Sequence, residues 1–218
     1  MRPLTDTVPK PLLKVGGKAL IVWHIEKLAR AGFDEIVINH AYLGHLIEAE
    51  LGNGKQFDID LLYSPESSAL ETAGGIANAL PLLGERAFPA VNADIFSDYD
   101  YRDLHAETLM LEEDTSRSAH LVLVDNPTHH PGGDFVLRNG LLVPDGSPRL
   151  TFSGIGIYRR SFFHGVARGE IAPLAPLLRA GIATGRISGE RFSGTWTDVG
   201  TPERLEQLNL AIQPKVIH

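Results

Sequence analysis

The chain has 218 residues and a formal net charge of −7, with 43% hydrophobic residues and no cysteine. The lack of cysteine excludes disulfides and thiolate zinc sites, and the lack of any Lys/Arg run argues against a nucleic-acid surface. No apolar stretch is long enough to cross a membrane or to act as a secretory signal. We therefore expect a cytoplasmic protein with no membrane or nucleic-acid partner; a homo-oligomer is compatible with this composition.

Strands and helices alternate in the first half of the chain. Leu20, Ile25 and Leu28 lie on one face of a helix that Gly32 ends. The short apolar runs that follow, with helical patterns between them, predict βαβ units and a mostly parallel sheet. In chain order we expect a helix over 18–31, a strand over 35–39, a helix over 43–51, a strand over 59–63, a helix over 76–83 and a strand over 88–92.

The second half is less regular but continues the α/β pattern. Asn139-Gly140 is typical of a hairpin turn, and Thr201 followed by Pro202 is typical of a helix start. We expect strands over 120–124, 150–158 and 195–199, a hairpin over 134–143, and helices over 162–167, 174–184 and 202–212. The sequence thus predicts a single α/β domain over 1–218 with a doubly wound, mostly parallel, Rossmann-like sheet.

Two carboxylates lie where open parallel sheets bind ligands, beyond the carboxyl ends of the strands. Asp94 comes two residues after the strand over 88–92, and Asp198 falls near the end of the strand over 195–199. If both face one cleft, they repel by roughly 4 kcal/mol at about 4 Å and an effective dielectric constant of about 20. A bound Mg²⁺ removes that repulsion. Alternatively, either Asp caps a turn, and position alone leaves both interpretations open.

A cation and a pair of glycines are further candidates for phosphate or nucleotide contacts. Lys10 lies between Pro9 and Pro11, which hold the backbone extended and fix the root of the side chain. Gly74 and Gly75 lead into a helix and permit close approach of a base or a phosphate to its N–H groups. The ordinary alternatives are a solvated loop lysine and glycines that allow a tight start to the helix.

Histidines give weaker signals. His40 follows the strand over 35–39 and is a candidate to line the site. His129 and His130 are adjacent, so on a strand their side chains point to opposite faces and chelate a metal poorly. We expect a surface loop at this pair.

Four motifs occur in an order that resembles the sugar-1-phosphate nucleotidyltransferases: Met1-Arg-Pro-Leu-Thr5, Pro9-Lys-Pro-Leu12, Asn92-Ala-Asp94 and Trp196-Thr-Asp-Val-Gly-Thr-Pro-Glu203. Four more are similar to the N-acetylmuramate-1-phosphate uridylyltransferase branch of that family, which acts in bacterial cell-wall recycling: Ile38-Asn-His40, Tyr63-Ser-Pro-Glu66, Leu121-Val-Leu-Val-Asp-Asn-Pro127 and Phe152-Ser-Gly154. The resemblance runs the whole length of the chain. Because relatives of this branch are often labelled mannose-1-phosphate guanylyltransferases, the resemblance indicates the reaction class better than the nucleotide.

The resemblance implies transfer of a nucleotidyl group from a nucleoside triphosphate to a sugar 1-phosphate, with release of pyrophosphate and Mg²⁺ as the cofactor. It also implies a nucleotide-binding half up to about residue 126 and a sugar-binding half over 127–218. The implied roles are catalysis for Lys10, Arg2 and Asp94, metal binding for Asp94 and Asp198, nucleotide binding for Glu71, Gly74 and Gly75, and sugar binding for Asn92 and Gly154.

The family normally has a buried strand and a Gly-rich loop before Arg-Pro-Leu-Thr, whereas this sequence starts at Met1-Arg2. In the doubly wound order that strand lies between the strands over 35–39 and 88–92. We therefore expect these two strands to lack a ladder partner, so that the chain is destabilised or repaired by an intruding segment or a partner chain. We also expect it to be inactive by itself. Ala93 stands where a glycine is usual. A non-catalytic binding module of the same fold is the alternative from another functional class.

Overall fold

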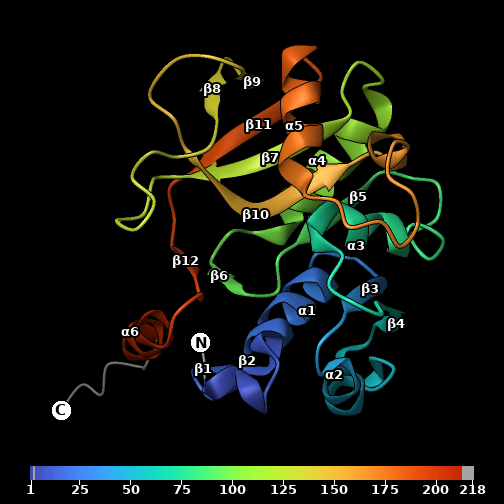
Figure 1. Ribbon diagram of the computed structural model, residues 1–218, viewed down its shortest axis with the longest axis vertical. Coiled ribbons are helices and arrows are strands. Elements are labelled where there is room, and N and C mark those ends of the chain that lie inside the picture. The colour runs from blue at the N-terminus through green and yellow to red at the C-terminus, as the bar shows by residue number, and fades with distance from the viewer. Residues whose placement is uncertain (2, 213–218) are drawn as a thin grey trace.

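The computed structural model describes Met1 and residues 3–212. Arg2, to which the resemblance gives a catalytic role, lies outside the described residues. A six-stranded sheet forms the largest part of the fold (Figure 1). Its strands lie in the order β5 (Phe88–Val91), β10 (Thr151–Tyr158), β7 (Ala119–Val124), β11 (Ile187–Phe192), β9 (Leu141–Val143) and β8 (Val136–Arg138).

The sheet has strands of both directions. β10 is antiparallel to β5 and to β7, and β7 is parallel to β11. The strands β5, β7 and β11 therefore run the same way, as in a doubly wound fold, and β10 runs against them. The predicted α/β, Rossmann-like fold is confirmed, but the prediction of a mostly parallel sheet is wrong for the six-stranded sheet. This sheet is mixed, because β10 lies between β5 and β7 and because β9 pairs antiparallel with both β11 and β8.

Helices cover both faces of this sheet (Figure 1). α3 (Glu71–Ala79) and α5 (Leu174–Ala183) share one apolar cluster with Leu121 of β7. α4 (Tyr101–Glu113) shares a second cluster with Val122, the next residue of the same strand. Successive residues of a strand point to opposite faces, so the fully buried β7 separates the two halves of the core.

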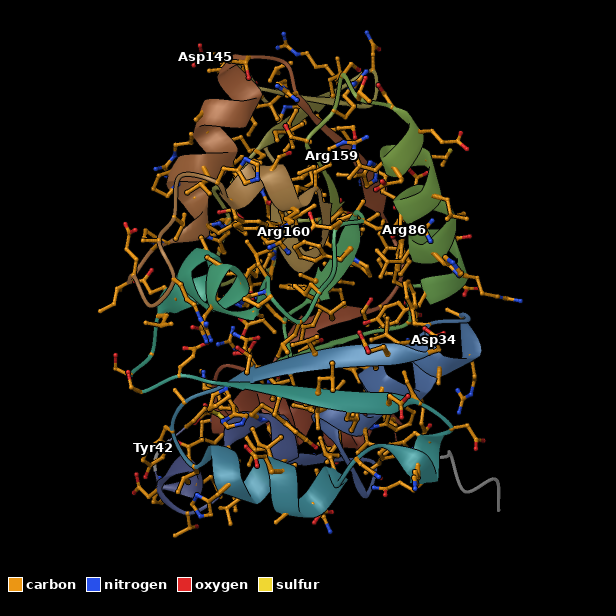
Figure 2. The ribbon with its side chains drawn as sticks, turned by 90° about the vertical axis from the view of Figure 1, so that its right-hand side faces the viewer. Asp34, Tyr42, Arg86, Asp145, Arg159 and Arg160 are labelled. Carbon is orange, nitrogen blue, oxygen red and sulfur yellow. The ribbon has the colours of Figure 1, made fainter. Side chains whose placement is uncertain are left out.

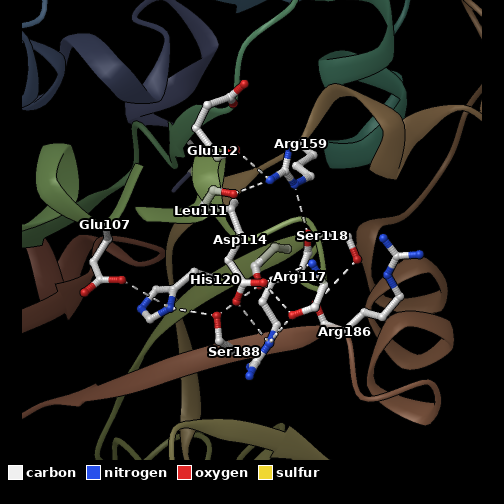
Figure 3. Close-up of polar contacts among 12 residues, drawn as sticks. Glu107, Leu111, Glu112, Asp114, Arg117, Ser118, His120, Arg159, Arg186 and Ser188 are labelled. Carbon is white, nitrogen blue, oxygen red and sulfur yellow. Dashed lines mark hydrogen bonds and ion pairs between the residues drawn. The ribbon is translucent and has the colours of Figure 1, made fainter. Parts of the chain in front are cut away.

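The helix α4 was not predicted from the sequence. Asp100 begins this helix by accepting a hydrogen bond from the backbone N–H of Arg102 at 3.0 Å. Arg159, which follows β10, ends it by donating to the carbonyl oxygens of Leu111 and Glu112, the second at 3.0 Å (Figure 3). A cation at the end of a helix compensates carbonyls that have no partner within the helix.

The remaining elements are short or lie outside the main sheet. The predicted helix over 76–83 begins earlier, at Glu71, and the predicted helix over 162–167 is a 3₁₀ turn, η4 (Arg160–Phe163). No helix in the described part of the chain is long and apolar enough to cross a membrane. The other elements are η1 (Leu4–Asp6), η2 (Lys10–Leu12), η3 (Lys55–Phe57), the pair β1 (Lys14–Val15) and β2 (Lys18–Ala19), the pair β6 (Ile95–Ser97) and β12 (Trp196–Asp198), and α6 (Pro202–Ile212).

Two strands form a separate layer beside the main sheet. β3 (Glu35–His40) and β4 (Asp60–Pro65) pair in parallel with each other and with no other strand of the described chain. α1 (Leu20–Arg30) and α2 (Gly44–Leu51) pack against this pair through a cluster of buried aliphatic side chains. Figure 2 shows the pair as a layer below the main sheet.

A cavity of about 940 Å³ separates β3 from β5. Its walls include Ile36 and Ile38 of β3, Val91 of β5, and Ile25 of α1. Among the described residues, no strand pairs with β3 or β5 on the sides that face this cavity. The expectation of an unpartnered edge on each strand is therefore confirmed for the described chain, and no described segment fills the gap as an intruding strand.

His24 holds one wall of this cavity in place. Its Nδ1 accepts from the hydroxyl of Tyr101 at 2.7 Å, and its Nε2 donates to the carbonyl of Ile95 at 2.8 Å. These two bonds need the neutral imidazole with its proton on Nε2. Burial lowers the pKa of His24 from 6.5 to about 4, because the folded protein does not solvate the charged form.

Acid is expected to destabilise the protein through His24. In the unfolded chain His24 binds a proton below pH 6.5, whereas in the folded chain it binds one only below about pH 4. The contribution of neutral His24 to the free energy of unfolding is therefore complete above pH 6.5 and is lost as the pH falls. At pH 4 the loss is about 3 kcal/mol. Urea unfolding at pH 7 and pH 4 should show this loss in the wild type and in His45→Gln, whose side chain is exposed. A pH dependence that is unchanged in His24→Gln would contradict the assignment.

Candidate active site

Lys10 and Asp94 meet at the mouth of the cavity. Pro9 is buried and extended, but the extended backbone expected at Lys10 is wrong, because Lys10 begins the 3₁₀ helix η2. Pro11 fits this helix near its start, where a missing N–H costs nothing. Lys10 Nζ lies 3.5 Å from Asp94 Oδ2, and the two side chains are 44% and 37% exposed. The structure thus brings together two of the predicted catalytic residues, and both remain accessible to a ligand.

Backbone pairing places the segment that contains Asp198 beside the segment that contains Asp94. In the antiparallel pair of β6 and β12, Asp198 lies opposite Ile95, and the N–H of Val199 donates to the carbonyl of Asp94 at 2.8 Å. The carboxylates have separate partners, because Asp198 Oδ2 lies 3.1 Å from His129 Nε2 and 2.5 Å from Arg204 Nη1. That both carboxylates bind one cation stays a prediction.

The donor chemistry at this edge suits Mg²⁺. Mg²⁺ takes oxygen ligands and is usually bound by one or two carboxylates together with substrate phosphates and water. Among the described residues there is no group of three or more His, Asp or Glu side chains that could hold a metal by itself. Two carboxylates on adjacent backbone segments, each already compensated by a cationic side chain, fit a metal that the substrate helps to bind.

The predicted nucleotide residues open α3. Glu71 is exposed and has a left-handed backbone with φ of +59°. Gly74 packs against the loop before α5: a Cβ there would overlap the carbonyl oxygen of Glu170. The N–H groups of Ala73 and Gly74 both donate to the carbonyl of Ala172 at 3.0 Å. These helix N–H groups are therefore satisfied by the protein, and Gly74 has a packing role in this structure.

Asn39 and Glu66 occupy the space beside Gly75. Asn39 Nδ2 donates to Glu66 Oε1 at 2.9 Å, and the N–H of Leu70 donates to Glu66 Oε2 at 2.9 Å. A Cβ at Gly75 would lie 2.5 Å from Asn39 Nδ2 and 2.7 Å from Glu66 Oε1. This pair, which joins the ends of β3 and β4, also lines the cavity, so a base that approaches Gly75 would meet it.

Gly75→Val is expected to weaken nucleotide binding and also to lower the free energy of unfolding by about 1–3 kcal/mol, because the larger side chain pushes Asn39 and Glu66 apart. Because Asn39 and Glu66 belong to the protein itself, the substitution is expected to disturb the fold as well as nucleotide binding. Denaturant unfolding and calorimetric titration with UTP measure the two effects. Gly165→Val is the matched control, because a Cβ at Gly165 has no neighbour within 4 Å. An unchanged nucleotide affinity in Gly75→Val would place the base elsewhere.

The predicted sugar-binding residues are in contact. Gly154, at a register shift of β10, has φ of +82°, and a Cβ there would lie 2.8 Å from Asn92 Nδ2. The N–H of Asn92 donates to the carbonyl of Gly154 at 2.8 Å. Gly154 is needed here because of the positive φ and the close approach of Asn92. Their role toward a sugar stays a prediction.

Sequence reasoning missed two side chains of this site. His129 lies in an exposed loop, as we expected, but it also contacts Asp198, and Arg204 contacts both. Arg204 lies six residues after Asp198 and directly follows the last motif. Nothing in the sequence shows that α6 turns this first-turn arginine back onto β12. His129 is brought to Asp198 from a position 69 residues earlier in the chain.

Comparison with known proteins shows the family of the chain. Residues 1–130 match the family described as "Nucleotidyl transferase". The chain belongs to this nucleotidyltransferase family.

Individual proteins with similar sequences or folds show which members of the family the chain resembles. The chain is 51% identical over 216 residues to the N-acetylmuramate alpha-1-phosphate uridylyltransferase of Neisseria meningitidis serogroup B, covering 95% of this chain and 90% of that protein. It is 30% identical to the mannose-1-phosphate guanyltransferase of Neurospora crassa, covering 93% of this chain and 58% of that protein. A crystal structure of UDP-glucose pyrophosphorylase complexed with UDP-glucose has the same fold, with a TM-score of 0.75 at 18% identity, over 97% of this chain and 92% of that one.

Proposed function

We propose that the protein transfers a uridylyl group from UTP to N-acetylmuramate 1-phosphate and releases pyrophosphate. The observation that supports this choice most directly is the 51% identity, over nearly the whole of both chains, to a protein named for that reaction. The meeting of Lys10 with Asp94, and of Asp94 with the segment that contains Asp198, supports the reaction class.

The proposed reaction needs positioning and charge compensation rather than a covalent intermediate. An oxygen of the sugar phosphate attacks the α-phosphorus of the nucleotide, the bond to the β-phosphate breaks, and pyrophosphate leaves with the electron pair. Lys10 would compensate the charge that develops on the phosphate oxygens. Asp94 and Asp198 would hold Mg²⁺, which when bound supplies further positive charge to those oxygens. Mg²⁺ dependence and a cytoplasmic location stay predictions.

Pyrophosphate release with matched substrate pairs tests the proposal. We expect UTP with N-acetylmuramate 1-phosphate to be preferred over GTP with mannose 1-phosphate, in a form of the chain extended at its amino end by an apolar strand and a Gly-rich loop. Preference for the second pair would instead favour the guanylyl reaction of the more distant relatives. Lack of release with either pair in a folded, extended chain would favour the non-catalytic binding module.

A further inference from the structure

Asp198 is neutralised more completely than Asp94. Arg204 Nη1 lies 2.5 Å from Asp198 Oδ2 with both side chains largely buried, at 22% and 31% exposure. His129 Nε2 lies 3.1 Å from the same oxygen and 2.6 Å from Arg204 Nη1. Lys10, by contrast, is 3.5 Å from Asp94 and more exposed. A single carboxylate oxygen of Asp198 is therefore already occupied by two nitrogen groups.

These contacts are incompatible with a metal on the same oxygen. A cation that binds Asp198 Oδ2 needs the space and the charge compensation that Arg204 Nη1 now supplies. His129 Nε2 cannot serve both neighbours at once, because it either donates to Asp198 or accepts from Arg204. Metal binding through Oδ2 of Asp198 therefore requires this group to rearrange.

Arg204 is the member of the group that is least well held where it lies. Its Nε is buried and has no hydrogen-bond partner, and a buried donor without a partner disfavours the conformation that creates it. Gly200 provides the space for the guanidinium: a Cβ at Gly200 would overlap Arg204 Nη2 and lie 2.7 Å from Asp198 Oδ1.

We propose that Arg204 is a displaceable counter-ion of Asp198: it holds the carboxylate in the metal-free protein and leaves it when a divalent cation binds. The proposal rests on the proposed function only in taking Asp198 as a metal ligand. It makes Arg204 a positioning residue that keeps Asp198 oriented between turnovers and sets the affinity for the metal. Since the two cations compete for one ligand, removing one must strengthen binding of the other.

Mn²⁺ binding to the purified chain, followed by electron paramagnetic resonance, tests the exchange without any turnover. Arg204→Gln is expected to bind Mn²⁺ about tenfold more tightly than the wild type, and Asp198→Asn is expected to lose this binding. Gly200→Ala is expected to change affinity in the same direction as Arg204→Gln without removing a charge. Arg204→Lys keeps the charge and should stay close to the wild type. Arg191→Gln is the matched control, because Arg191 pairs with Asp125 on an exposed surface.

Thermal unfolding separates this role from a purely structural one. Without metal, Arg204→Gln should melt below the wild type, and Mn²⁺ should raise its melting temperature more than it raises that of the wild type. The exchange would be overturned if the melting temperature of Arg204→Gln were equally far below that of the wild type with and without Mn²⁺. It would also be overturned if Arg204→Gln bound Mn²⁺ with unchanged affinity while Asp198→Asn lost binding. Neither result would affect the proposed function. Wild-type Mn²⁺ affinity in Asp198→Asn would also overturn it, by placing the metal elsewhere. Pyrophosphate release would still test the proposed function independently.

Discussion

An additional strand between β3 and β5 is expected to raise the melting temperature by about 10 °C. The two strands face each other across a cavity of about 940 Å³, and neither has a described partner on that side. Four or so new ladder hydrogen bonds at about 1 kcal/mol each give about 4 kcal/mol. In a protein of this size each kcal/mol corresponds to about 2–4 °C. Apolar residues that face Ile25 and Ile38 would add to the gain.

The experiment extends the chain at its amino end by a six-residue apolar strand and a Gly-rich loop and follows unfolding by circular dichroism. The matched control has the same length and loop but proline at alternate strand positions, because proline cannot donate to the ladder. We expect the first extension to stabilise the protein and to be required for pyrophosphate release. Equal melting temperatures for the two extensions, or full activity of the chain that begins at Met1, would show that the gap is not a strand position.

Lys10→Met is expected to lower kcat for nucleotidyl transfer by about 10²–10³-fold in the extended chain, because it removes the cation nearest to Asp94. Folding should be little affected, since the Lys10 side chain is nearly half exposed and exposed ion pairs contribute little to stability. Lys14→Met is the matched control, an exposed lysine of the neighbouring strand β1. Stopped assays of pyrophosphate release give kcat and KM separately. A change confined to KM would make Lys10 a binding residue with no part in the chemical step.

The parts of the fold that could be predicted are those with a clear local pattern. The strand of residues 35–39 and the helix that begins at Pro202 follow from periodicity and capping residues, and the structure has both. α4 could have been predicted, because Tyr101, Leu104 and Leu111 recur at helical spacing after the capping residue Asp100. Its end could not, because it depends on Arg159, a residue distant in sequence. β6 was missed because its three residues become a strand only through pairing with β12.

In the site, too, the sequence predicts the residues that have a local signal but not their tertiary neighbours. Lys10 and Asp94 were predicted to act together, and they meet. Gly74 and Gly75 were predicted to make room for a nucleotide, but the carbonyl of Glu170 and the Asn39 side chain occupy the space beside them. Local sequence shows that a glycine is needed, but only tertiary packing shows which atoms approach it.

The central claim is that Lys10, Asp94 and Asp198 form one metal-dependent transfer site, and a crystal of the extended chain grown with Mn²⁺ and UDP-N-acetylmuramate tests it most directly. Anomalous scattering locates the metal independently of the protein coordinates. We predict one Mn²⁺ bound by carboxylate oxygens of both Asp94 and Asp198, at about the 2.0–2.1 Å typical of Mg²⁺ ligands, with Lys10 on the diphosphate. A metal that contacts neither carboxylate, or a diphosphate bound away from Lys10, would contradict the claim.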